Sequence, residues 1–96
     1  MDVIRTSAVL TEVLHERERQ ENIHGEPNHK PEVWLMIIGE EIGEANKAAL
    51  ECHFQNNISI TNYREELIQV AASAVAAVEC LDRTYAMAAA GVEILP

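Results

Sequence analysis

The sequence predicts an all-α protein made of three long helices in a single domain, residues 1–96. Apolar residues recur at helical spacing in three segments, and only two breaks rich in Gly, Pro or Asn separate them. A chain of 96 residues suffices for one small domain. Because 4% of the residues are aromatic, the core of a single chain is thin, and we expect a four-helix-type bundle completed by oligomerisation.

The first helix is expected to run from about Val3 to Ile23. Leu10, Val13 and Leu14 give it an apolar patch, and Gly25 follows its end.

The second helix is expected from Glu32 to about Phe54, after Pro31, whose fixed φ suits a first helical turn. Five residues form its expected apolar stripe: Leu35, Ile38, Ile42, Ala45 and Ala49.

The third helix is expected to follow a break at Gln55 to Ile60 and to continue to about Ala89. Thr61 or Asn62 is the expected cap, which places Glu65 and Glu66 in the first turn, where the helix dipole favours acids.

The charge balance limits the partners of the chain. Sixteen acids against seven Lys and Arg give a net charge of -9, which repels nucleic acids and anionic membranes. A polyanionic substrate therefore requires cations. Two cysteines, the absence of a basic and apolar leader, and the lack of a long apolar run predict a cytoplasmic protein without a membrane segment.

Two carboxylate clusters carry the chemistry. Glu40, Glu41 and Glu44 fall within one 100° arc of the second helix, and Glu66 and Gln69 share a face of the third. Carboxylate oxygens suit Mg²⁺, which prefers hard oxygen ligands and keeps several waters. A solvated acidic face is the alternative for one such cluster, and its repetition on the next helix favours a metal site.

The segments EEIGEANKA (40–48) and EELIQ (65–69) together resemble the MazG-type all-α nucleoside triphosphate pyrophosphohydrolases. The family pattern, Glu-x-x-Glu, a spacer and Glu-x-x-Asp, is matched by Glu41, Glu44 and Glu66, whereas Gln69 stands where the family has Asp. ERERQENIHGEPNH (16–29) and the segment 63–83 resemble the small single-domain members, so the resemblance covers most of the chain. Dimeric dUTPase-like enzymes and phosphoribosyl-ATP pyrophosphohydrolases resemble it less.

The resemblance implies a hydrolase that cleaves a canonical or modified nucleoside triphosphate, typically a deoxynucleotide, into monophosphate and pyrophosphate. Such a reaction cleans the nucleotide pool. The cofactor implied is Mg²⁺, with Mn²⁺ able to substitute, and the assembly implied is a homodimer or homotetramer. By position, Glu41, Glu44 and Glu66 are metal ligands, and Gln69 either ligates through its amide oxygen or orients a water. Glu40 is another ligand or the base that orients the attacking water.

Several other side chains are candidates for substrate contact. Lys47 and Arg83 can meet phosphate oxygens, although each can equally form a surface ion pair. Trp34 can stack on a base or belong to the core. The loop residues that can bond a base or sugar, or else only cap the loop, are His24, Asn28 and His29.

Two other classes fit parts of the sequence. Glu12-x-x-His15 and Glu21-x-x-His24 match the di-iron helical motif, but both lie on one helix, whereas di-iron sites take them from two. The second is an acidic helical interaction module that kept the fold without turnover, and such a module would bind neither Mg²⁺ nor nucleotide tightly.

Overall fold

The computed structural model describes residues 1–54, 60–89 and 91, with side chains described up to residue 86 and at Gly91. Three α-helices make up this part of the chain: α1 (Val3–His24), α2 (Pro31–Phe54) and α3 (Ile60–Ala89). The described residues contain no strand, so the expected all-α class is confirmed. None of these helices is long and apolar enough to cross a bilayer.

The helix α1 is bounded by well-formed caps. Asp2 accepts a hydrogen bond from the Arg5 backbone N–H at 3.1 Å, which satisfies one free donor of the first turn. At the other end Gly25 has a φ of 75°, and its N–H donates to the Glu21 carbonyl at 2.8 Å. The expected boundaries of α1 are therefore right to within one residue at its carboxyl end.

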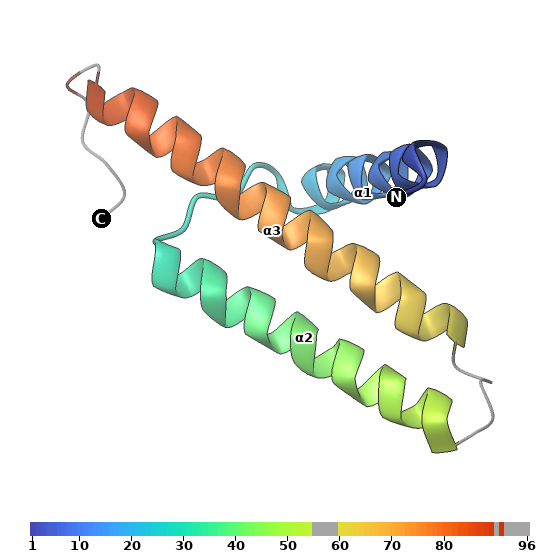
Figure 1. Cartoon of the computed structure of the whole chain (residues 1–96). Coiled ribbons are helices and arrows are strands. Elements are labelled where there is room, and N and C mark those ends of the chain that lie inside the picture. The colour runs from blue at the N-terminus through green and yellow to red at the C-terminus, as the bar shows by residue number, and fades with distance from the viewer. Residues whose placement is uncertain (55–59, 90, 92–96) are drawn as a thin grey trace.

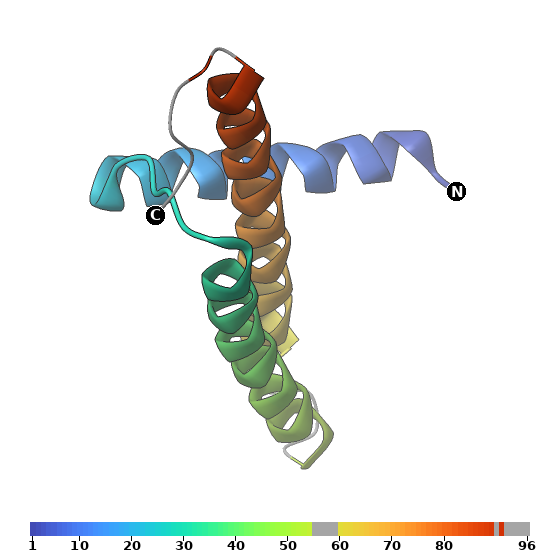
Figure 2. The ribbon, with the colours of Figure 1, turned by 90° about the vertical axis from the view of Figure 1, so that its left-hand side faces the viewer.

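The buried face of α1 is narrower than the sequence predicted. Val13 is buried, whereas Leu10 and Leu14 are 61% and 57% exposed. The reason is that α1 crosses α3 instead of running along it (Figure 2), so only a short stripe is covered. Arg17, one turn beyond Val13, is the other buried residue of this helix.

The helix α2 begins at Pro31, one residue before the expected start at Glu32, and ends at Phe54 as expected. Its expected apolar stripe is partly wrong, because Leu35 and Ile42 are 69% and 45% exposed. The buried residues of α2 are Trp34, Ala45, Ala48 and Cys52, and only Ala45 among them belongs to the expected stripe. Small side chains allow helices to approach closely, so α3 packs on the face rich in Ala and Cys and not on the one with the most Leu and Ile.

The helix α3 begins at Ile60, so Thr61 and Asn62 lie inside it and the expected cap at these positions is wrong. Glu65 and Glu66 consequently fall beyond the first turn, which contains no acid. Most of the predicted break before this helix, residues 55–59, lies outside the described residues. The expected end near Ala89 is confirmed.

The helices α2 and α3 form an antiparallel hairpin, and α1 packs across α3 (Figure 1). The core consists of Trp34, Ala76 and Cys80, with Ile37 and Ala77 packed around it. It is a thin core for a molecule of 55 × 30 × 26 Å. Its radius of gyration is 15.9 Å, against about 12.5 Å for a compact chain of this length.

Candidate active site

A cleft of about 350 Å³ lies where α1 crosses the α2/α3 hairpin. Its walls come from all three helices and from the loop between α1 and α2. Its polar side chains include Glu16, Arg17, Arg19 and Gln20 from α1, Glu41 from α2, and Gln69 and Ser73 from α3. His24, His29 and Trp34 also line the cleft. A cavity of this size with convergent polar groups is typical of a small-molecule site.

Glu41 is the carboxylate at the centre of this arrangement. It lies on the face of α2 that contacts α3, one turn before Ala45, and the buried Ser73 hydroxyl donates a hydrogen bond to its Oε1. Burial raises the pKa of Glu41 above its ordinary range, and the charges of Glu66 and Glu16 raise it further, while the bond from Ser73 opposes the rise. Two carboxylates, those of Glu66 and Glu16, thus act on the charge of Glu41.

The structure brings together part of the predicted metal set. Glu41 and Gln69 line the cleft, and Glu66 lies close enough for its charge to act on Glu41. Glu40 and Glu44 are exposed and do not line the cleft, because the face of α2 that contacts α3 carries Glu41 instead. Their roles stay predictions.

The oxygen donors around the cleft are of the kind that a hard divalent cation prefers. Such a cation would stabilise the Glu41 carboxylate, whose pKa is raised by burial first and by the charges of Glu66 and Glu16 second. Within the described residues, however, no three Asp, Glu, His or Cys side chains converge closely enough to hold a metal ion.

Glu16 is a site residue that the sequence analysis missed. Its side chain is 13% exposed and accepts hydrogen bonds from Arg19 Nε at 2.9 Å and Arg19 Nη2 at 2.6 Å. Gln20 Nε2 donates to the same carboxylate at 3.0 Å. The hydrogen bonds from Arg19 lower the pKa of Glu16, so this acid stays ionised beside the cleft. Only the crossing of α1 over α3 reveals its position, and helical periodicity carries no signal of that crossing.

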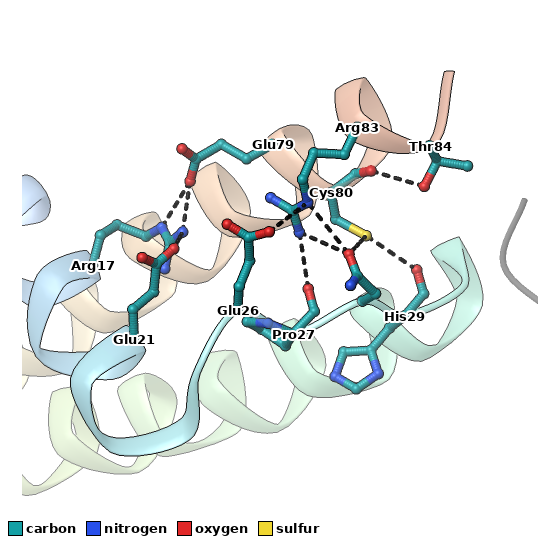
Figure 3. Close-up of polar contacts among 10 residues, drawn as sticks. Arg17, Glu21, Glu26, Pro27, His29, Glu79, Cys80, Arg83 and Thr84 are labelled. Carbon is teal, nitrogen blue, oxygen red and sulfur yellow. Dashed lines mark hydrogen bonds and ion pairs between the residues drawn. The ribbon is translucent and has the colours of Figure 1, made fainter. Parts of the chain in front are cut away.

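Arg17 was also missed, and it fixes α1 on α3. Its Nε and Nη2 donate to Glu79 at 2.9 and 2.7 Å, and Nη2 also meets Glu21 at 2.6 Å (Figure 3). Burial lowers the pKa of Arg17, but the hydrogen bonds to the two acids outweigh it, and the pKa lies above its ordinary value. The ion pair between Arg17 and Glu79 holds the part of α1 that lines the cleft against α3.

Arg83 and Asn28, both candidates for substrate contact, bind each other. Arg83 Nη2 donates to Asn28 Oδ1 and to the Pro27 carbonyl, each at 3.0 Å, and its Nε lies 3.2 Å from Glu26 (Figure 3). Cys80 Sγ adds a 3.5 Å contact with the His29 carbonyl. These bonds hold the loop between α1 and α2 against α3, in accord with the alternative of loop capping.

The remaining candidates divide between the cleft and the surface. His24 and His29 line the cleft, and the His29 ring stacks edge-on against Trp34 with centroids 5.0 Å apart. Trp34 is 6% exposed and belongs to the core, as one of its two interpretations predicted. Lys47 is exposed and does not line the cleft. Comparison of the chain with protein-family models, curated proteins and solved structures found no match.

Proposed function

We propose that the chain is a Mg²⁺-dependent nucleoside triphosphate pyrophosphohydrolase that converts a nucleoside triphosphate, typically a deoxynucleotide, into monophosphate and pyrophosphate. The observation that carries the proposal is that Glu41 and Gln69 line one cleft, with Glu66 near enough for its charge to act on Glu41. They come from the two segments whose sequence resembles the MazG-type enzymes, and the cleft has room for part of a nucleotide.

The residues of the chain have distinct tasks in this proposal. Glu41, Glu66 and Gln69, together with Glu44, would hold Mg²⁺, which supplies charge neutralisation along the phosphate chain. Ser73 fixes one oxygen of Glu41 and leaves the other free to face a ligand or a water. Because the pKa of Glu41 is raised, its carboxylate is a stronger base than an ordinary Glu, which suits a group that orients an attacking water. The aromatic end of the cleft, at His29 and Trp34, would receive the base.

The proposed assembly is a homodimer or homotetramer that completes a four-helix-type bundle. The chain exposes 6931 Å², whereas a compact monomer of 10.7 kDa exposes about 5500 Å². The difference, about 1400 Å² on one chain, exceeds the roughly 800 Å² that a standard interface buries on each partner, so it is large enough for a subunit contact. An apolar groove of about 470 Å³ between α2 and α3 includes the exposed side chains of Leu35 and Val78, and a second copy of the chain is its proposed occupant.

The test is pyrophosphate release from a panel of ribo- and deoxynucleoside triphosphates with Mg²⁺ or Mn²⁺. We expect monophosphate and pyrophosphate as products, with loss of at least 100-fold in rate for Glu41→Gln and full activity for Glu18→Gln. Glu18 is a matched control because it is an exposed α1 acid that does not line the cleft.

A second candidate function is an acidic helical interaction module without turnover. Two observations favour it: Gln69 replaces an acid, and the described side chains form no closed metal group. If no nucleoside triphosphate is turned over or bound in the presence of Mg²⁺, this second function replaces the first.

A further inference from the structure

The carboxylates of Glu16 and Glu41 line the cleft, and the charge of Glu66 acts on Glu41, yet the substrate proposed for this cleft is a polyanion. Besides Mg²⁺, a cation of the chain is therefore expected beside the phosphates. All seven Lys and Arg residues of the sequence lie within the described part of the structure. Only Arg17 and Arg19 line the cleft. The search for a phosphate contact therefore reduces to these two side chains.

Arg17 is unsuited to bind a ligand. It is 7% exposed, and its guanidinium is held by Glu79 and Glu21, so a phosphate would have to break the contacts that join α1 to α3. Two carboxylates already hold this guanidinium, so a phosphate would have to displace both of them.

Arg19 differs from Arg17 in each respect. Its side chain is 56% exposed, and its one ion pair is with Glu16, three residues away on the same helix. Pairs of this kind on a helix surface contribute little to stability and exchange partners easily. Arg19 and Glu16 also line a second, more open hollow beside the cleft, together with Gln69. The guanidinium thus stands at the mouth of the cleft, on the side where Gln69 leaves the metal site without an acid.

We propose that Arg19 binds the phosphate chain of the nucleotide by exchanging Glu16 for phosphate oxygens. The guanidinium fork presents the same two donors, Nε and Nη2, to Glu16 now and to a phosphate after the exchange. In the free protein Glu16 holds the guanidinium of Arg19 in this position and prevents other anions from binding to it. Binding releases the Glu16 carboxylate into the cleft beside Glu41. The inference rests on the proposed function, because it names a residue of the same site.

The experiment measures the affinity of α,β-imido-dUTP, a non-hydrolysable triphosphate, by calorimetry in Mg²⁺ at low salt, or of the imido analogue of whichever base the turnover panel prefers. We expect Arg19→Gln to weaken binding roughly 10- to 100-fold, the effect of losing charged hydrogen bonds. Arg19→Lys, which keeps the charge without the fork, should lie between. Arg5→Gln is the control, since Arg5 is an exposed arginine of α1 that lines neither the cleft nor the second hollow, and it should change affinity less than twofold.

The exchange makes a second prediction of opposite sign. Glu16→Gln removes the competitor for Arg19 and should tighten binding about two- to fivefold. In an Arg19→Gln background this gain should vanish, which separates the exchange from a general effect of charge. Circular dichroism of each variant confirms that the helices are intact.

Three results would overturn the inference. Equal affinities for Arg19→Gln and Arg5→Gln exclude Arg19 as a phosphate contact, while the proposed function stands. Weaker binding by Glu16→Gln, or a gain that persists without Arg19, excludes the exchange. Failure of the unmodified protein to bind or turn over any triphosphate removes the proposed function itself, and this inference with it.

Discussion

Replacing Glu41 by Gln should stabilise the folded protein at neutral pH while abolishing its proposed activity. Glu41 lies on the contact face of α2, partly buried, and the carboxylates of Glu66 and Glu16 repel it. A neutral amide of the same size keeps the acceptor for Ser73 and removes the desolvated charge. Weak charge interactions of this kind are worth about 0.5–1 kcal/mol. For a domain of this size that corresponds to a rise in Tm of about 2–8 °C.

The stabilisation should depend on pH with a definite sign. The pKa of Glu41 is higher in the folded state than its ordinary value of 4.5, so folding favours its protonated form. The stability that protonated Glu41 contributes to the folded state is therefore fully present below about pH 4.5, and it is lost as the pH rises through the pKa of Glu41 in the folded state. The difference in Tm between Glu41→Gln and the unmodified protein should grow over this interval and level off above it.

The assay is thermal unfolding followed by circular dichroism at 222 nm from pH 4 to pH 8. All samples need equal protein concentration, because the Tm of an oligomer depends on it. Glu18→Gln serves as the control and should give a small difference without this pH profile. A Glu41→Gln protein that is less stable at pH 7, or whose Tm difference does not change with pH, would refute the reasoning.

Three further changes test the packing around the cleft. Arg17→Met should lower the free energy of unfolding by about 1–2 kcal/mol in urea denaturation, because it removes charged hydrogen bonds whose partners stay solvated. An unchanged free energy of unfolding would show that other contacts hold α1. Arg83→Ala should cost about as much and speed proteolytic cleavage in the loop 25–30 that it holds, with unchanged cleavage as the contrary result. Leu35→Asp should reduce the proposed oligomer to a smaller species in light scattering, whereas Ile4→Asp, a change at another exposed apolar residue, should not. An unaffected mass would place the interface elsewhere.

The helices could be predicted from the sequence because each one is long and clearly punctuated. Asp2, Gly25 and Pro31 act locally, through caps and fixed φ angles, so the limits of α1 and the start of α2 follow from nearby residues. The buried face of α2 could not be predicted in the same way. Periodicity favours the stripe containing Leu35 and Ile42, but α3 packs where Ala and Cys permit close approach, and that choice is made by the partner helix.

The site shows the same division between local and tertiary information. Spacing along each helix led to Glu41 on α2 and Gln69 on α3, and both line the cleft. It could not separate Glu41 from Glu44, because the two share a face and only the position of α3 distinguishes them. Glu16 and Arg19 could not be found at all, since they reach the cleft through the way α1 crosses α3. In a bundle this small, the position of a crossing helix depends on a few contacts, here including the ion pairs Arg17–Glu79 and Arg64–Glu12.

The position of Glu41 itself bears on the choice between an enzyme and an interaction module. The contact face of α2 otherwise carries Trp34, Ala45, Ala48 and Cys52, and an Ala at 41 would continue that face without the cost of burying a charge. The facing helix carries Ser73, which is 5% exposed and donates to Glu41, in an otherwise Ala-rich stretch. An interaction surface needs its acids on the outside, where Glu40 and Glu44 already stand. Glu41 instead points inward, where a buried hydroxyl holds it and two other carboxylates repel it. Such an arrangement lowers the stability of the fold, and it is expected at a site where a carboxylate takes part in catalysis.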